Sequence, residues 1–255
     1  MMPAIIGHRG AATEAPENSL AALRLAVSLG ADALELDVRR SADGVLVVIH
    51  DPDLRRTSDR QGLIAELSLE QIRRADLSGA ADPGIPRWPE PLAVPRLEDV
   101  FEEFPGIEIT VDVKDPAACE DVSRMVEDFD RVPRTILYVD AGTDMACFRE
   151  YPGRRATSVA QAARLAADPS WLRRAPERDL PEVVHTPLRE AGRRLVSADL
   201  VKAIHDSGRK IQVWTIDDLP AMEWLSACGV DGIITNDVRA AVEHFGRNGE
   251  SEERT

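Results

Sequence analysis

Short runs of β-branched and aliphatic residues alternate with helix-like stretches along this chain, and the alternation limits its fold more than any other feature. Such runs are typical of buried strands, and strands that alternate with helices are typical of parallel sheets. We predict strands at 4–8, 33–39, 107–113, 135–139, 156–159, 182–186, 211–216 and 232–235. Eight such strands within 255 residues predict an α/β fold of the (β/α)8 barrel type.

Helix-like stretches with recognisable ends separate several strands. Asn18 is expected to cap the first helix, which stops at Gly30, and later helices at 197–208 and 219–228 also stop at a glycine. The competing α/β arrangement is an open, doubly wound sheet. It is disfavoured because GHRG at 7–10, after the first strand, lacks the glycine spacing of a nucleotide-binding loop.

The chain is expected to form one domain over residues 1–246. Residues 52–96 are rich in proline, glycine and charge and are too long for a simple connection, so we interpret them as a small insertion early in the barrel. The polar, non-periodic tail at 247–255 is expected to be disordered. No sequence feature indicates the oligomeric state.

Composition restricts the partners of the protein. The balance of 31 basic against 45 acidic residues argues against nucleic acid or an anionic membrane surface, so an anionic substrate must meet a local positive patch or a metal. Neither a membrane span nor a signal peptide is evident. The widely spaced Cys119, Cys147 and Cys228 are expected to be buried, reduced thiols of a cytoplasmic protein.

Chemistry-bearing residues gather where the predicted strands end, the position of active sites in such barrels. Glu35 and Asp37 are two residues apart on one strand and therefore share a face. The full set of strand-end candidates is His8, Arg9, Glu35, Asp37, Asp112, Lys114, Trp214 and Asn236.

A hairpin signal adds a second histidine to this set. Asp43-Gly44 is typical of a two-residue turn between two β-like runs. With that turn, residues whose numbers sum to 87 face each other, so His50 is expected directly opposite Asp37, with Cβ atoms about 4.5–5.5 Å apart. A bulge would change this register.

Each candidate has a simpler explanation when taken alone. A Glu-x-Asp pair is usually an exposed or salt-bridged strand face, Lys114 can merely pair with Asp112, and Trp214 can be core. Together, however, carboxylates that point into a barrel bury like charges, which is costly unless a cation neutralises them. Three carboxylates without cysteine form a hard oxygen site, suited to Mg²⁺ or Ca²⁺ rather than zinc.

These residues lie within a recognisable pattern. The sequence from HRG at 8–10 through PENS, GADALELDV and DGVLVVIHD resembles the glycerophosphodiester phosphodiesterase family. VPRLEDVF, VDVK, QVWTIDD and GVDGIITND extend the resemblance over nearly the whole chain. The resemblance implies a (β/α)8 barrel with a small insertion, in agreement with the strand pattern.

The resemblance also implies roles for the candidates. His8 and His50 correspond to the two catalytic histidines of the family. Glu35 and Asp37 correspond to two metal ligands, and the third falls on Asp112.

Further roles follow from the same resemblance. Arg9 and Lys114 correspond to basic residues that contact the phosphate. Glu17 of PEN corresponds to a residue that supports the site, and Trp214 to an aromatic residue near the alcohol groups of the substrate.

Three residues depart from the family pattern. Ser19 replaces the usual Thr at a helix start, and Arg96 replaces a Thr on the barrel rim. Asp112 replaces Glu, so a carboxylate one methylene shorter must draw the metal towards its strand or bind it through water. A lipid-cleaving phospholipase D branch of the superfamily also has Asp at this position.

The leading hypothesis is metal-dependent hydrolysis of glycerophosphodiesters, such as glycerophosphocholine or glycerophosphoethanolamine, to sn-glycerol 3-phosphate and an alcohol, with the two histidines as acid and base. Cleavage of lysophospholipids is the first alternative; it needs an apolar surface, for which the insertion offers Ile85, Trp88 and Leu92. A non-catalytic barrel that binds phosphodiesters is the second. The sequence leaves open the preferred head group, the ion, the roles of the two histidines and whether a cyclic phosphate forms.

Overall fold

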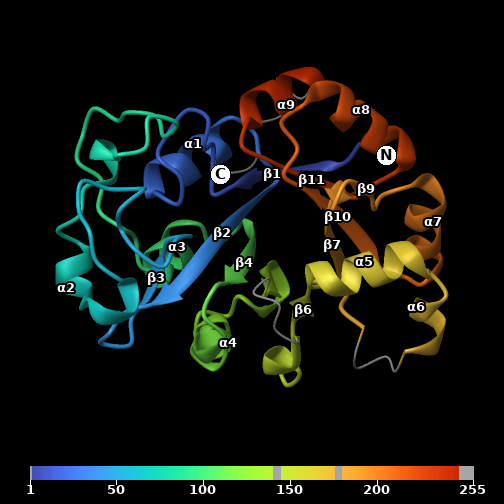
Figure 1. Ribbon diagram of the computed structural model, residues 1–255, viewed down its shortest axis with the longest axis horizontal. Coiled ribbons are helices and arrows are strands. Elements are labelled where there is room, and N and C mark those ends of the chain that lie inside the picture. Colours follow the sequence, from blue (N-terminus) through green and yellow to red (C-terminus); the bar gives the residue numbers. More distant parts are fainter. Residues whose placement is uncertain (1, 140–144, 176–179, 247–255) are drawn as a thin grey trace.

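Eight parallel strands surround a common centre in the computed structural model, which describes residues 2–139, 145–175 and 180–246. Neighbouring strands follow chain order around the ring (Figure 1). They are β1 (Ala4–His8), β2 (Ala33–Arg40), β4 (Glu108–Val113), β5 (Thr135–Tyr138), β6 (Arg154–Arg155), β7 (Val183–Pro187), β10 (Lys210–Trp214) and β11 (Gly232–Thr235). A bridge between Ala156 and Val183 joins the two ends of the sheet, so the predicted (β/α)8 barrel is confirmed.

Helices occupy the connections between the strands. They are α1 (Leu20–Ser28), α2 (Leu69–Ile72), α3 (Leu97–Glu103), α4 (Cys119–Asp128), α5 (Val159–Ala167), α6 (Trp171–Arg174), α7 (Ala198–Asp206), α8 (Leu219–Cys228) and α9 (Val238–His244). Short 3₁₀ turns lie at Ile64–Glu66, Leu77–Gly79, Pro116–Ala118, Val132–Arg134 and Met145–Phe148, and β8 (Arg189–Glu190) pairs with β9 (Arg193–Arg194). The predicted helices at 197–208 and 219–228 are confirmed as α7 and α8. The tail at 247–255, predicted to be disordered, lies outside the described residues.

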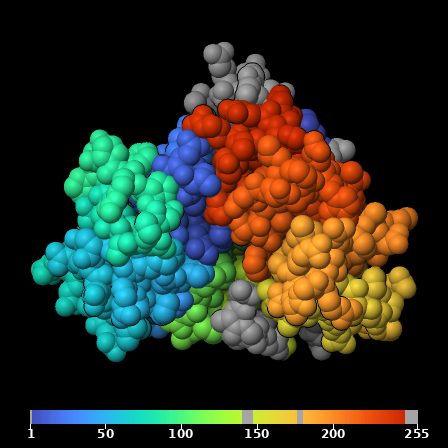
Figure 2. Space-filling model, turned by 45° about the horizontal axis from the view of Figure 1, so that its top comes forward, coloured from blue at the N-terminus to red at the C-terminus, as the bar shows by residue number. Residues whose placement is uncertain are grey.

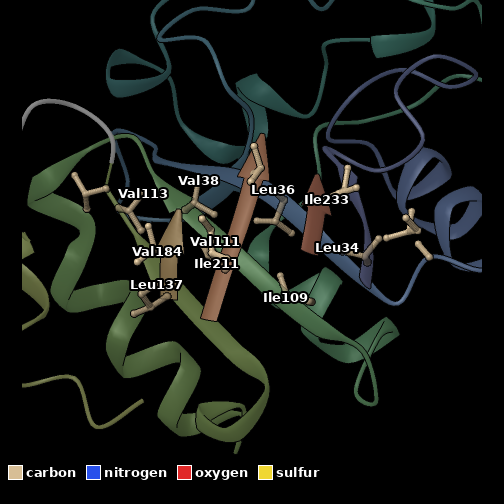
Figure 3. Packing of buried hydrophobic residues seen from close by; sticks show 14 of the residues in the cluster. Leu34, Leu36, Val38, Ile109, Val111, Val113, Leu137, Val184, Ile211 and Ile233 are labelled. Carbon is tan, nitrogen blue, oxygen red and sulfur yellow. The ribbon is translucent and has the colours of Figure 1, made fainter. Parts of the chain in front are cut away.

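Side chains alternate between the two faces of the barrel wall. Leu34, Leu36 and Val38 of β2 point outward into the main core, beside Val111 and Val113 of β4 (Figure 3). The same core includes apolar side chains of the surrounding helices. Because strand side chains alternate, the residues between these positions point into the barrel. The wall therefore buries one apolar face under the helices, whereas its inner face combines polar residues with apolar ones such as Ile6 and Ile136.

Two sequence predictions of element boundaries are wrong. Ser19, not Asn18, caps α1, with its side chain accepting a hydrogen bond from the backbone of Ala22. The strand predicted at 156–159 lies earlier, as β6, because Ser158 forms a capping box with Gln161 and starts α5. In both cases a serine that can accept a backbone N–H decides where the helix begins.

The β2–β3 hairpin is one residue out of the predicted register. β3 (Leu46–Val48) pairs with β2 so that Val38 faces Val48, and the numbers of facing residues sum to 86. Ile49, not His50, therefore lies opposite Asp37, and its backbone N–H donates to the Asp37 carbonyl at 3.0 Å.

The turn of this hairpin explains the shift. Ser41 N–H donates to Val45 O at 2.9 Å, and Gly44 N–H donates back to Ser41 O at 3.0 Å, which leaves three residues in the loop instead of two. Gly44 has a φ of 83°. A three-residue loop with glycine in the left-handed region is the next commonest hairpin turn after the two-residue forms.

Residues 52–96 carry a small core of their own. Leu54, Ile64 and Ile72 pack there with Val47 and Val94. These residues form a lobe at one side of the molecule, coloured cyan to green in Figure 2. That residues 52–96 are an insertion stays a prediction.

The described residues contain no helix that is both long and apolar enough to cross a bilayer. Of the three thiols expected to be buried, Cys119 is buried, whereas Cys228 is half-buried and Cys147 is exposed. The expectation of uniformly buried thiols is therefore wrong for two of the three.

Candidate active site

Strand register brings three carboxylates together inside the barrel. His8 of β1 lies beside Glu35 of β2, and Asp37 of β2 lies beside Asp112 of β4. The three carboxylate side chains are buried, and one oxygen of each lies within 4.8 Å of the others. The sequence predicted that these residues meet, and the structure brings them together.

Two cationic side chains hold Asp37 and Asp112. Lys114 Nζ lies 3.1 Å from Asp37 Oδ1 and 2.5 Å from Asp112 Oδ2, and Arg9 Nε lies 3.0 Å from Asp37 Oδ2. Burial alone would raise the pKa of Asp37, but Arg9 and Lys114 outweigh it and hold that pKa below its usual range. Burial would lower the pKa of Lys114, but the two carboxylates raise it above its usual value. The site thus keeps two positive charges at neutral pH.

Glu35 is placed differently. Its Oε2 accepts the backbone N–H of Arg9 at 3.1 Å and lies 3.8 Å from Nε2 of His8. Burial, and then the neighbouring charge of Asp37, raise the pKa of Glu35 well above its usual value. A divalent cation among the three carboxylates would relieve this repulsion. The oxygen-only donor set fits a hard ion such as Mg²⁺ or Ca²⁺.

The glycines of GHRG have separate functions. Arg9 and Gly10 form the turn after β1 with φ values of 57° and 88°. A Cβ on Gly10 would lie 2.5 Å from the carbonyl carbon of Ala22, so only glycine allows α1 to pack against this turn. A Cβ on Gly7 would meet the Cβ of Ala26 at 3.0 Å. Gly10 serves the turn, and Gly7 serves helix packing.

Asn18 holds Asp37 in place. Its Nδ2 donates to Asp37 Oδ2 at 2.8 Å, and its Oδ1 accepts the backbone N–H of Asp37 at 3.2 Å. Asn18 is buried and has a φ of 57°, which suits asparagine better than most residues. The sequence analysis missed this contact because a polar residue before a helix is a common capping signal.

A charged network connects Arg9 to His50. Glu17 accepts hydrogen bonds from Arg9 Nη1 at 2.8 Å and from both terminal nitrogens of Arg56 at 2.7 Å. Arg56 Nε donates to Asp51 Oδ2 at 2.6 Å, and Asp51 Oδ1 lies 2.7 Å from Nδ1 of His50. Arg56 therefore supports the partners of both Arg9 and His50. Neither Arg56 nor Asp51 was predicted, although Asp51 follows His50 directly.

At Nδ1, His8 contacts a neutral amide and not a carboxylate. Its Nδ1 lies 2.7 Å from Asn236 Oδ1, and Asn236 Nδ2 donates to Asp217 Oδ2 at 2.8 Å. Asp217 thereby turns the amide oxygen of Asn236 towards His8, so the His8 proton lies on Nδ1 and the lone pair on Nε2. Burial, and then the Arg9 charge, lower the pKa of His8 to about 4, so the ring is neutral at pH 7.

Most of the candidates line one cavity of about 130 Å³ at the carboxyl ends of the strands. Its lining residues are His8, Arg9, Glu35, Asp37, His50, Asp112, Lys114, Tyr138, His185, Trp214, Thr215 and Ile234. Of the predicted residues, Glu17 and Asn236 are not in this lining; Glu17 contacts Arg9, and Asn236 contacts His8. Tyr138 and His185 were missed, although both lie on predicted strands. His50 is in the cavity despite the wrong register.

Several proteins that are similar to this chain in sequence or structure are named glycerophosphodiester phosphodiesterases. The model of the glycerophosphoryl diester phosphodiesterase family matches residues 8–240. The chain is 28% identical to the glycerophosphodiester phosphodiesterase of Caldanaerobacter subterraneus subsp. tengcongensis, over 98% of this chain and all of that protein. The crystal structure of the glycerophosphodiester phosphodiesterase of Agrobacterium tumefaciens is 29% identical, with a TM-score of 0.72 over 94% of this chain and all of that one.

A further structure shares the fold at lower identity. The phosphodiesterase of Oleispira antarctica, solved in complex with the product sn-glycerol-3-phosphate, has a TM-score of 0.76 and 23% identity over 96% of this chain and 97% of that one. Since the family model spans most of the chain and the site residues converge in the barrel, the chain belongs to the glycerophosphoryl diester phosphodiesterase family and is an enzyme of that class.

Proposed function

We propose that the protein hydrolyses glycerophosphodiesters to sn-glycerol 3-phosphate and an alcohol, in a reaction that depends on a divalent cation. The observation that carries this proposal is the convergence of three carboxylates, two cationic side chains and two histidines in one cavity. A phosphodiester is anionic and has a poor leaving group, so its hydrolysis needs charge neutralisation and proton transfer. The cavity offers residues for both.

Glu35, Asp37 and Asp112 would hold the ion, Mg²⁺ or Ca²⁺. When bound, it supplies Lewis-acid polarisation of the phosphoryl oxygens. Arg9 and Lys114 contact the same phosphate and stabilise the charge that develops on it. Their ion pairs with Asp37 keep both side chains directed into the cavity.

We propose different roles for the two histidines, on the basis of their partners. His8 keeps its proton on Nδ1 towards the neutral Asn236 and presents the Nε2 lone pair, so it accepts a proton from the attacking oxygen. The carboxylate of Asp51 lies on Nδ1 of His50 and orients the ring. Since His8 takes the role of the base, we assign to His50 the donation of a proton to the leaving alcohol.

Trp214 lies on β10, four strands from β4 around the ring and therefore opposite Asp112, where we propose that it contacts the alcohol portion of the substrate. The strands of one wall thus bind phosphate, and β10 on the other wall binds carbon and hydroxyl groups. Head-group preference then depends on residues other than those that line this cavity.

The decisive assay measures glycerol 3-phosphate release from glycerophosphocholine and glycerophosphoethanolamine by the purified protein. Turnover should stop in excess EDTA and return with Mg²⁺ or Ca²⁺. Substitution of either histidine by alanine should lower kcat by about 10²–10⁴-fold without unfolding the protein. Undiminished turnover in EDTA would refute the cation requirement.

The lysophospholipid alternative has little support on the surface of the insertion. Ile85 is buried, Trp88 is half-buried, and Leu92 packs against the small core of the 52–96 lobe. The large apolar side chains that are exposed within the described residues are Met2 and Leu63, which do not form an acyl-binding surface. Lysophosphatidylcholine should therefore be a poorer substrate than glycerophosphocholine.

We propose that the protein acts in the cytoplasm, on the grounds of its widely spaced cysteines. We also propose that residues 1–246 form one phosphodiesterase domain, since a single barrel contains all the site residues.

A further inference from the structure

The cavity contains a buried histidine that the proposed reaction does not use. His185 projects from β7, which lies four strands from β2 around the ring and hence on the opposite side of the barrel from Glu35 and Asp37. The side chain is 2% exposed and lines the same cavity as the carboxylates. Burial lowers the pKa of His185 to about 4, so the ring is neutral at pH 7.

The partner of His185 fixes the position of its proton. Nε2 lies 2.9 Å from Oε1 of Gln212, the residue that faces it on β10. An amide oxygen only accepts hydrogen bonds, so Nε2 carries the proton and Nδ1 presents a lone pair. Gln212 is held against Gly232, where a Cβ would lie 3.0 Å from Cγ of Gln212.

Nδ1 of His185 is a buried acceptor without a protein partner among the described residues. A second such atom lines the cavity: Nε1 of Trp214, an obligatory donor, is buried and has no hydrogen-bond partner in the described part of the chain. Trp214 lies on β10, next to β7. An unsatisfied buried polar atom typically costs about 1–3 kcal/mol, so such atoms at a cavity wall indicate a bound group that completes them.

We propose that His185 is a specificity-determining residue whose Nδ1 accepts a hydrogen bond from a hydroxyl group of the glycerol moiety of the substrate. Trp214 Nε1 donates to the oxygen of a glycerol hydroxyl from the adjacent strand. One acceptor and one donor match a diol, in which each hydroxyl both donates and accepts. The inference rests on the proposed function, because it assigns one part of that substrate to one wall of the cavity.

The glycerol half fits this position better than the head group does. His185 is buried and lies two residues before the end of β7, so its ring lies deeper in the barrel than the side chains at the strand ends. The alcohol that leaves must depart through the open mouth. Choline, moreover, offers no hydroxyl once it is esterified, whereas the glycerol half of every glycerophosphodiester keeps two.

The test compares two ligands that differ only in their hydroxyl groups, sn-glycerol 3-phosphate and n-propyl phosphate. Calorimetric titration with Mg²⁺ present should give tighter binding of sn-glycerol 3-phosphate to the unchanged protein. His185→Gln keeps a donor for Gln212 but places no polar atom at the Nδ1 position. It should weaken sn-glycerol 3-phosphate binding by about five- to tenfold and leave n-propyl phosphate unchanged.

His185→Asn is the matched control, because its amide reaches the Nδ1 position and should retain most of the preference. If the Gln variant does not fold, the Asn variant decides alone: retained preference supports the inference and lost preference overturns it. Equal weakening of both ligands by His185→Gln would mean a packing role and would overturn it, as would the absence of any preference in the unchanged protein. Release of sn-glycerol 3-phosphate by the unchanged protein separately tests the proposed function.

Discussion

Arg56 helps to position two functional side chains, Arg9 and His50, by binding a partner of each. One guanidinium binds Glu17, which holds Arg9, and Asp51, which holds His50. Its hydrogen bond to Glu17 and its other contacts raise the pKa of Arg56 above its usual value, so the charge is permanent. We infer that Arg56 is a positioning residue that acts through its neighbours and does not touch the substrate.

This role predicts the behaviour of Arg56→Lys. A lysine keeps the charge but cannot bridge both carboxylates with a planar fork. We expect kcat to fall by about tenfold while KM and the unfolding midpoint change little. Arg55→Lys, at the exposed neighbouring residue, is the matched control and should leave kcat unchanged. An unaltered kcat in Arg56→Lys would contradict the positioning role.

The roles of the two histidines predict a dependence on the leaving group. If His50 protonates the leaving alcohol, His50→Ala should impair glycerophosphoethanolamine hydrolysis by about 10²–10⁴-fold but affect a p-nitrophenyl ester of glycerol phosphate far less. p-Nitrophenolate leaves readily without a proton. His8→Ala should slow the hydrolysis of both substrates to a similar degree. The measurement is kcat of each variant with each substrate, relative to the unchanged protein. The reverse pattern would exchange the two roles.

At the scale of elements, the β2–β3 hairpin illustrates what limits prediction from sequence. Asp43-Gly44 correctly indicated a turn, but the pattern does not distinguish a two-residue loop from a three-residue loop with glycine last. The observed loop is also bonded to a distant segment, since Asp43 Oδ1 accepts the backbone N–H of Leu69 at 3.0 Å. Such long-range contacts select the turn, and local sequence does not contain them.

The same hairpin gives a stability prediction. Gly44 has a φ of 83°, and a Cβ there meets nothing closer than 3.9 Å, so Gly44→Ala is penalised by backbone conformation alone. We expect a loss of about 1 kcal/mol in the free energy of unfolding, measured with urea. Gly106→Ala is the control, because this glycine lacks a positive φ and has nothing within 4 Å of its Cβ position. Equal effects of the two substitutions would contradict the assigned turn.

At the scale of the whole molecule, the barrel and most of the residues that line the cavity could be predicted from the sequence. The strand pattern and the strand-end rule placed Glu35, Asp37 and Asp112 together, because their positions depend only on alternation and parallel register. Asn18, Arg56 and His185 were missed because their contacts join segments far apart in the chain. A side chain whose role depends on one tertiary partner carries no periodic signal.

The buried histidines predict how stability of the whole fold varies with pH. The folded-state pKa of both His8 and His185 is about 4, below the ordinary value of 6.5, so the unfolded chain binds more protons between these values. Their contribution is present in full above pH 6.5 and is lost as pH falls towards 4. Urea unfolding at a series of pH values should show this slope, and His185→Gln should reduce it. A slope unaffected by the substitution would contradict the buried neutral ring.

The pairing between β6 and β7 is the weakest contact described in the ring of strands. β2 and β4 pair over a register of six residues, whereas β6 consists of two residues and meets β7 through the bridge at Ala156. Local opening needs the fewest broken bonds there, so the amide of Thr157, bonded to Val183 O, should exchange with deuterium faster than the amide of Lys114, bonded to Val38 O. The barrel would then open transiently between β6 and β7, on the side away from the charged residues. The carboxylates and cations would keep their spacing during this opening.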